Sequence, residues 1–313
     1  MTQITTLTLA PSLDSATTTD RMYAEGKLRC SAPQFEPGGG GINVARAIVH
    51  LGGKASALFP IGGPTGRHLA DLLTEEGVTA VALETHDWTR QNLHVHVEST
   101  GEQYRFVMPG ARLTVDEFQL FERHLAGLPQ GSLLVISGSL PPGVGVENLR
   151  HLLREAQRQG LQCIVDTSGP ALRACLEVGN LALVKPNQKE LAELVNRDLI
   201  DPDAVRQAAL EIIRQGKTQR VVVSLGPQGA LAVDKDNVFQ VVPPPVKKMS
   251  TVGAGDSMVG AMTQKLADGA DLLDMVRYGV AAGSAATLHK GTRLCTLKDT
   301  RRIYDYLRQD DVI

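Results

Sequence analysis

Short apolar, β-branched segments alternate with amphipathic helical patterns along most of this chain, and this alternation constrains its fold most strongly. The segments expected to form strands are 4–9, 55–61, 133–136, 163–165, 181–184 and 221–225. Several are apolar without interruption, which is typical of strands buried on both faces. The helical patterns cover 42–51, 65–76, 115–125, 147–159, 188–195 and 203–215. The alternation predicts an α/β fold with a mostly parallel sheet and helices on both faces, in a single domain spanning residues 1–313.

Two segments interrupt this alternation. Residues 15–36 lack a helical period, whereas residues 90–108 alternate between polar and apolar side chains on both sides of a turn at 99–102. The second pattern is that of a β-hairpin. We predict that residues 15–36 and 88–108 form a small antiparallel insertion, which serves as a lid or as an interface between chains. Helical patterns return in the C-terminal third, at 255–267, 272–288 and 299–307.

The composition argues against several kinds of partner. The 313 residues carry 32 Lys and Arg and 34 Asp and Glu, a formal net charge of −2. Binding of nucleic acid or of a membrane surface through bulk charge is therefore not expected. No apolar run is long enough to span a membrane, and the N-terminus lacks the pattern of a secretory signal. The four cysteines lack metal-ligand spacing and are expected to be reduced thiols, which predicts a cytoplasmic protein.

Residues 250–256, Ser-Thr-Val-Gly-Ala-Gly-Asp, form the strongest functional motif of the chain. Glycines at the start of a helix leave backbone N–H groups pointing outward, and the positive end of the helix dipole lies behind them. Such a segment can bind an anion such as phosphate. A carboxylate at this place would repel the anion, so Asp256 suggests proton transfer beside a phosphate. The motif therefore predicts phosphoryl transfer.

Four glycines at 38–41 precede another predicted helix, with Asn43 in its first turn. They could bring the backbone close to a ligand whose hydroxyls Asn43 binds, or they could form a flexible turn. The cluster does not match the Gly-x-Gly-x-x-Gly pattern that follows a first strand, and the chain has no P-loop motif. Both absences argue against a dinucleotide-dependent oxidoreductase and a P-loop NTPase.

Three further places follow predicted strands, and each has two interpretations. Asp14 could hold sugar hydroxyls or form a turn. Asn187 and Glu190 have the spacing of a helix capping box, but they could also lie near a hydrated Mg²⁺, with Lys185 neutralising phosphate. The segment 224–230 could be a plain hairpin turn or a cradle for a nucleotide. The residues alone leave these alternatives open.

Taken in order, these motifs resemble those of the PfkB branch of the ribokinase-like carbohydrate kinases. The resemblance covers residues 8 to about 307 and rests on segments 38–43, 184–190, 224–226 and 251–256. It implies a three-layer α-β-α ribokinase-like fold with a small antiparallel β lid. It also implies an enzyme of glycolysis that phosphorylates the C1 hydroxyl of fructose 6-phosphate with MgATP, as a homodimer formed through the lid.

The resemblance also implies roles for individual residues. Asp256 is expected to be the catalytic base, and the N–H groups of Gly253, Ala254 and Gly255 are expected to hold the migrating phosphoryl group. The residues expected to bind fructose 6-phosphate are Asp14, Gly39, Gly40, Asn43, Arg90 and Ser139, with Lys27 supplied by a partner subunit. Those expected to bind ATP are Lys185, Asn187, Ser224, Gly226 and Gly229, with Glu190 holding Mg²⁺ through water.

Two departures from the family pattern bear on the cation and on the sugar. Ser250 stands where many relatives have Asp, but oxygens of Ser250, Val252, Ala286, Gly291 and Arg293 can still frame K⁺. Relatives that act as 1-phosphofructokinases or tagatose-6-phosphate kinases typically have lysine where Gly40 stands, and its absence favours fructose 6-phosphate. Those two activities remain the enzymatic alternatives. A sugar-phosphate sensor on the kinase fold is the non-enzymatic one, although Asp256 speaks against it.

Overall fold

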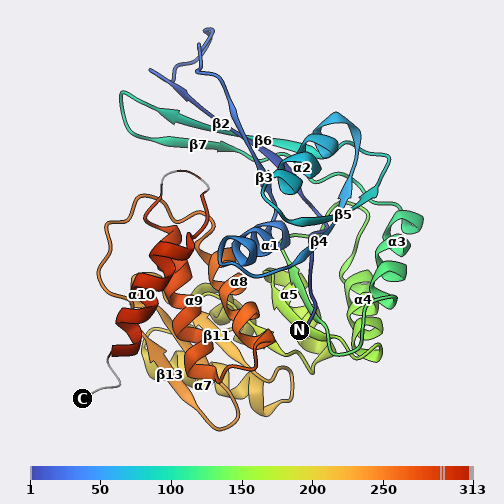
Figure 1. Ribbon diagram of the computed structural model, residues 1–313, viewed down its shortest axis with the longest axis vertical. Helices are drawn as coiled ribbons and strands as arrows, with labels where there is room; N and C mark the ends of the chain where they lie inside the picture. Colours follow the sequence, from blue (N-terminus) through green and yellow to red (C-terminus); the bar gives the residue numbers. More distant parts are fainter. Residues whose placement is uncertain (1, 290, 292, 310–313) are drawn as a thin grey trace.

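The chain folds around two β-sheets of different size (Figure 1). The computed structural model describes residues 2–289, 291 and 293–309, and within them the large sheet has nine strands in the order β13-β12-β11-β10-β9-β8-β1-β4-β5. These strands are β1 (Ile4–Leu7), β4 (Ser56–Ile61), β5 (Thr79–Glu84), β8 (Leu133–Ser137), β9 (Gln162–Asp166), β10 (Leu183–Val184), β11 (Val221–Ser224), β12 (Ala230–Val233) and β13 (Val238–Val241). The second sheet, which we call the lid, has the order β3-β2-β6-β7 and contains β2 (Ser12–Thr19), β3 (Gln34–Gly38), β6 (Arg90–Val97) and β7 (Gln103–Phe106).

Most of the large sheet is parallel. β1 lies between β4 and β8, with Thr5 opposite Ser56 on one side and Leu134 on the other. Antiparallel pairing within the described sheet is confined to one edge, where β12 pairs with β11 and β13 pairs with β12. β8 is buried along its whole length, as its continuous apolar sequence predicts. Because the other strands are parallel, their carboxyl ends meet at one edge, which is where open α/β sheets bind ligands.

Helices cover both faces of the large sheet, which confirms the three-layer α-β-α architecture. One face packs against α1 (Gly40–His50), α2 (Gly63–Glu75), α8 (Ala254–Ala267), α9 (Leu272–Ala286) and α10 (Leu297–Gln309), through a core that includes Ile42 and Val259. The other face packs against α3 (Val115–Ala126), α4 (Val146–Arg158), α5 (Gly169–Val178), α6 (Gln188–Val195) and α7 (Pro202–Arg214), through a core that includes Phe121 and Val205. Among the described helices, none is both long and apolar enough to cross a membrane.

Most helices and strands lie within a few residues of the ranges expected from the sequence, but three elements were not predicted. These are β5, β13 and α5. Helix α5 begins with Gly169 and a proline and ends before Gly179, so its short sequence looks like a loop between glycines. The strand expected at 181–184 is shorter, because Leu181 forms only an isolated bridge with Thr218 and β10 contains two residues.

The lid contains the hairpin predicted near residue 100. β6 and β7 pair in antiparallel fashion, and β3 pairs with β2 in the same way. The central pair, β2 and β6, is parallel from Ser12 opposite Arg90 to Thr19 opposite Val97. Each of these two strands follows a parallel strand of the large sheet, so both leave the sheet in the same direction. Figure 1 shows the lid projecting above α1 and the C-terminal helices, α8 to α10.

The core under α3 gives a test of the layer arrangement. Phe121 is fully buried against the sheet, whereas Val115 on the same helix is 64% exposed. We expect Phe121→Ala to lower the free energy of unfolding by about 3–5 kcal/mol, because it leaves a cavity. Val115→Ala, the matched control, should change it by less than about 0.5 kcal/mol. Urea unfolding of both variants measures the difference, and equal values would contradict the packing described here.

Candidate active site

The start of α8 has the geometry of an anion site. Its N-cap, Gly253, has φ 74°, a left-handed conformation that favours glycine. The first helical hydrogen bond of α8 joins the N–H of Ser257 to the carbonyl of Gly253 at 2.8 Å. The N–H groups of the residues before Ser257 therefore lie in the unpaired first turn. The N–H of Ala254 donates to the carbonyl of Thr251 at 3.4 Å, and this long hydrogen bond could be replaced by one to an anion.

Asp256 lies in this first turn and contacts the second glycine-rich motif. Nδ2 of Asn43 on α1 donates to Oδ2 of Asp256 at 3.0 Å. The two helices approach closely at Gly260, where an added Cβ would lie 3.0 Å from both Ala47 and the Val44 carbonyl. The structure thus brings together two motifs that are 213 residues apart in the sequence.

A buried ion pair lies next to these residues. Lys185, 7% exposed, follows β10, and its Nζ is 3.1 Å from Oδ1 of Asp166 at the end of β9. A Cβ placed on Gly255 would lie 3.5 Å from Lys185 Nζ, so this ammonium group is beside the α8 N-terminus. Burial alone would lower the pKa of Lys185, but the negative charges of Asp166, Asp256 and Glu190 raise it. Lys185 is therefore a permanent positive charge at the anion site.

The same surroundings perturb Asp256. Burial, and then the negative charge of Asp166, raises the pKa of Asp256 to about 7, against the opposing effects of Asn43, Lys185 and Arg46. A carboxylate with a pKa close to neutral is suited to general-base catalysis. Asp166 was missed in the sequence. It could have been found as the acid directly after the apolar segment 163–165, where open α/β sheets bind ligands.

The glycines at 38–41 are packed too tightly for a flexible turn, so that alternative is wrong. Gly38 ends β3 and Gly40 begins α1. A Cβ on Gly40 would lie 2.4 Å from Ser137 Oγ and 2.8 Å from the Gly138 nitrogen. Gly39, the N-cap of α1, has φ 121°, which only glycine adopts readily. The segment therefore brings bare backbone against the carboxyl end of β8.

On the lid side, Asp14 lies within β2 and not in a turn, so the turn alternative is also wrong. Its Oδ1 accepts hydrogen bonds from Ser12 at 2.7 Å and from Nδ2 of Asn92 at 2.9 Å. An added Cβ on Gly38 would lie 2.5 Å from Asp14 Oδ2, so this carboxylate adjoins the glycine segment. Asn92, which is buried, received no role in the sequence because its neighbours suggested only a hairpin strand.

Two of the residues expected to bind fructose 6-phosphate, Arg90 and Ser139, lie on opposite sides of the boundary between the lid and the large sheet. Arg90, at the start of β6, donates to the carbonyls of Ala10, Pro11 and Met108 at 2.8–3.3 Å. Burial lowers the pKa of Arg90, and the charge of Asp14 partly offsets this effect. Ser139 is exposed just beyond the carboxyl end of β8. The role of these side chains in phosphate binding remains a prediction.

The residues expected to bind ATP gather at the carboxyl ends of β10 and β11. Asn187 and Ser224 form a parallel bridge, and the Ser224 N–H donates to Pro186 at 3.0 Å. Asn187 and Glu190 make a complete capping box, with both reciprocal bonds at 2.8 Å. Gly226 and Gly229 belong to the short turn that joins β11 to antiparallel β12. The structural interpretations of both motifs are confirmed, and they place the candidate ligand groups side by side.

The donor groups fit both cations implied by the resemblance. Among the described residues, no group of three His, Cys, Asp or Glu could hold a metal ion. Glu190 offers carboxylate oxygens, which Mg²⁺ binds while it keeps several waters and contacts substrate phosphates. For K⁺, Ser250 Oγ donates to the Gly291 carbonyl at 2.7 Å, and the Met249 N–H donates to the Thr287 carbonyl at 2.8 Å. These bonds bring Met249 and Ser250 beside Thr287 and Gly291. Their hydroxyl and carbonyl oxygens are the donors that K⁺ prefers.

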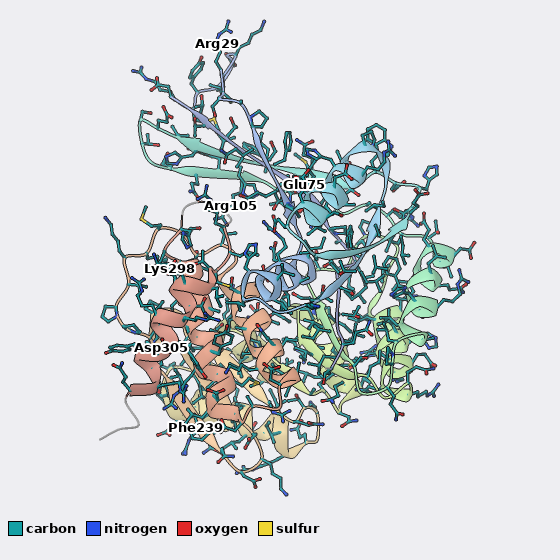
Figure 2. The ribbon with its side chains drawn as sticks, in the orientation of Figure 1. Arg29, Glu75, Arg105, Phe239, Lys298 and Asp305 are labelled. Atoms are coloured by element: carbon teal, nitrogen blue, oxygen red, sulfur yellow. The ribbon has the colours of Figure 1, made fainter. Side chains whose placement is uncertain are left out.

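A cleft of about 860 Å³ lies between the lid and the loops on either side of α8 and α9. Three of the residues expected to frame K⁺ line it, namely Val252, Gly291 and Arg293. Figure 2 shows Arg105, which also lines this cleft, between the lid and the C-terminal helices. Arg29, by contrast, lies at the outer end of the lid (Figure 2). Lys27 is exposed in the same connection between β2 and β3, so it lies away from the site of its own chain.

The sequence matches the pfkB family carbohydrate kinase model over residues 7–299. The curated ATP-dependent 6-phosphofructokinase isozyme 2 of Escherichia coli (strain K12) is 67% identical over 307 residues, which cover 98% of this chain and 99% of that protein.

Three solved structures of phosphofructokinase-2 from Escherichia coli are also similar, and each covers 98% of this chain and 100% of its own. The complex with potassium has a TM-score of 0.96 and 67% identity. The complex with fructose-6-phosphate and the tetrameric inhibited form each have a TM-score of 0.94 and 66% identity.

The raised pKa of Asp256 gives a test of its role as base. Because only the ionised carboxylate can accept a proton, we expect kcat/KM to rise with pH through a limb near pH 7. Asp256→Asn should lower kcat by about 10²–10⁴-fold, with little change in KM. Steady-state kinetics between pH 5.5 and 9 (roughly two units around the expected pKa) measure both effects.

Asp268, the exposed C-cap at the other end of α8, is the matched control. Asp268→Asn should keep the parent kcat and the parent pH profile. If Asp256→Asn keeps a kcat near that of the parent, Asp256 is not the base.

Proposed function

The chain belongs to the pfkB family of carbohydrate kinases, and we propose that it is an ATP-dependent 6-phosphofructokinase, which converts fructose 6-phosphate to fructose 1,6-bisphosphate in glycolysis. The observation that carries this proposal is the position of Asp256 in the first turn of α8, beside Lys185 and hydrogen-bonded to Asn43. The proposed base Asp256, the anion site at the start of α8 and the positive charge of Lys185 then lie next to one another. The relative with 67% identity over nearly the whole chain is a 6-phosphofructokinase by name.

In the proposed reaction, Asp256 takes the proton from the C1 hydroxyl of fructose 6-phosphate. The C1 oxygen forms a bond to the γ-phosphorus of ATP, the bond from that phosphorus to the bridging oxygen breaks, and ADP leaves. The N–H groups of Gly253, Ala254 and Gly255 donate to the migrating group, and Lys185 offsets its negative charge. Alignment and charge stabilisation of this kind supply most of the catalysis in phosphoryl transfer.

The other predicted residues divide between the two substrates. In this proposal fructose 6-phosphate is bound from the lid and the glycine segment by Asp14, Gly39, Gly40, Asn43 and Arg90, and from beyond β8 by Ser139. Those at the ends of β10 and β11, Lys185, Asn187, Ser224, Gly226 and Gly229, bind ATP. This division is supported by the two groups of contacts described above, one around Asp14 and Gly38 and the other around Asn187 and Ser224.

Two cations complete the proposed site. Glu190 holds Mg²⁺ through water, and Ser250, Val252, Ala286, Gly291 and Arg293 contribute oxygens to K⁺. Mg²⁺ bound to ATP neutralises phosphate charge, and K⁺ stabilises the loop before α8. The K⁺ assignment is supported by the bonds of Met249 and Ser250 to Thr287 and Gly291, and by the potassium complex of the Escherichia coli protein.

A substrate panel tests the proposed function directly. With ATP and Mg²⁺, we expect release of ADP to be fastest with fructose 6-phosphate. Faster turnover of fructose 1-phosphate or tagatose 6-phosphate would instead establish one of the two alternative kinase activities. No turnover of any sugar phosphate, together with measurable binding of one, would identify a sensor.

We also propose that the protein assembles through the lid and works in the cytoplasm, where ATP is available. The Escherichia coli relative has a tetrameric inhibited form, so that protein forms oligomers. Here every residue of β7 is exposed, and apolar side chains of Tyr104, Phe106, Val107 and Met108 continue along it. An exposed apolar edge strand suits a partner subunit. Lys27, at the outer end of the lid, would then reach the partner's site.

Mixed subunits test this arrangement. Lys27→Ala should raise the KM for fructose 6-phosphate by about tenfold or more, since a charged hydrogen bond to phosphate is lost. A heterodimer of Lys27→Ala and Asp256→Asn chains, purified through two different tags, contains one site with both native residues. It should therefore regain about half the parent activity at low substrate, because a two-fold dimer has two sites. No gain over the two homodimers would show that Lys27 acts within its own chain or not at all.

A further inference from the structure

Arg46, on α1, is a buried charge that the proposed reaction does not use. It is only 5% exposed. Its guanidinium donates to both carboxylate oxygens of Glu76, each at 2.8 Å, and to the Pro37 carbonyl of the lid strand β3 at 3.0 Å. A further bond runs to Oδ1 of Asn43 at 3.2 Å. Arg46 therefore connects the lid, the end of α2 and the side chain that holds Asp256.

Glu76 is well suited to fix Arg46. It is the C-cap of α2, and Nε2 of His50 also lies 3.3 Å from its Oε2. Burial alone would raise the pKa of Glu76, but the hydrogen bonds from His50 and Arg46 outweigh it and lower this pKa to about 2. The carboxylate therefore stays ionised, and its bidentate contact sets the plane of the guanidinium.

This plane determines the orientation of the Asn43 amide. An arginine side chain can only donate hydrogen bonds, whereas an amide has one accepting and one donating end. Oδ1 of Asn43 must therefore face Arg46, which turns Nδ2 toward Oδ2 of Asp256 at 3.0 Å. The opposite orientation would place the amide oxygen against the carboxylate and the amide N–H groups against the guanidinium, and both contacts are repulsive.

We propose that Arg46 is a positioning residue for phosphoryl transfer, which fixes the Asn43 amide so that it holds Oδ2 of Asp256 and leaves Oδ1 to take the proton of the acceptor hydroxyl. This inference rests on the proposed kinase function and adds a residue that contacts neither substrate. Glu76 supports it by holding the guanidinium. The arrangement also ties the base to the lid strand β3, through the bond from Arg46 to Pro37.

Arg46 has a second effect, through its charge. The charged groups that act on Asp256 are Asp166 from β9, Lys185 beyond β10 and Arg46 from α1, together with the hydrogen bond from Asn43. Arg46 lowers the pKa of Asp256. Its removal should therefore move the acid limb of kcat/KM toward higher pH, because Asp256 then ionises less readily.

Arg46→Met tests the proposal against a purely structural role. Arg150, which ion-pairs with Glu147 and Glu177 between α4 and α5, is the matched control because its side chain is 19% exposed and lies outside the site. Both variants lose an arginine that pairs with glutamates. For Arg46→Met we expect kcat per folded enzyme to fall about tenfold or more, with KM values nearly unchanged and the acid limb shifted upward. Arg150→Met should keep the parent kcat and pH profile.

Arg46→Lys keeps the charge but loses the planar fork that makes the bidentate contact with Glu76, so it fixes the Asn43 amide less firmly. It should show an intermediate kcat and the acid limb of the parent. If Arg46→Met does not fold, this variant alone decides. A kcat and a pH profile equal to those of the parent, in any folded Arg46 variant, would overturn the proposal. Failure of the parent enzyme to phosphorylate fructose 6-phosphate would instead overturn the proposed function, so the two failures are distinguishable.

Discussion

The contact between α1 and α8 is the constraint on which the rest of the site depends. Gly260 has no side chain, so α8 can approach Ala47 and the Val44 carbonyl of α1 closely. This approach brings Asn43 within hydrogen-bond distance of Asp256. A larger residue at 260 would separate the helices, and Asp256 would lose the amide that holds it. The position of Asp256 is therefore set by packing about one helical turn away, in the interface between α1 and α8.

Charge balance is the second requirement of the site. Two carboxylates, Asp166 and Asp256, lie near a buried ammonium group, Lys185. Burial raises the pKa of Asp256 most, and the negative charge of Asp166, which keeps the ion pair with Lys185, raises it further. An acid that is poorly stabilised as an anion is a better proton acceptor near neutral pH. Burial of Asp256, together with the negative charge of Asp166, is thus the physical origin of its raised pKa.

Much of this arrangement could be predicted from the sequence, because it depends on local patterns. The apolar strands and amphipathic helices specify the layers, and the glycines at 38–41 and 253–255 mark the two helix starts that meet at the site. What could not be predicted depends on contacts between distant elements. The partnership of Arg46 with Glu76 exists only once α1 lies beside the end of α2. The parallel pairing of β2 with β6 likewise depends on the directions in which two separate strands leave the large sheet.

Asp166 is a different case. Ligands of open α/β sheets bind beyond the carboxyl ends of strands, and this rule, which drew attention to Asp14, would also have found Asp166. Both acids lie near the carboxyl ends of strands. Asp14, in turn, proved to lie inside a lid strand. The rule located the correct edge of the sheet in both cases, but it could not specify the local conformation.

The lid combines two tasks that many enzymes keep apart. In the proposed enzyme its inner side carries Asp14 and Arg90 toward the sugar phosphate, while β7 presents an apolar edge to a partner. The groups that transfer the phosphoryl group come from the large sheet and α8. A lineage that changed its sugar would therefore alter the element that joins its subunits, whereas the chemistry could stay the same. Substrate choice and quaternary structure are expected to evolve together in such a protein.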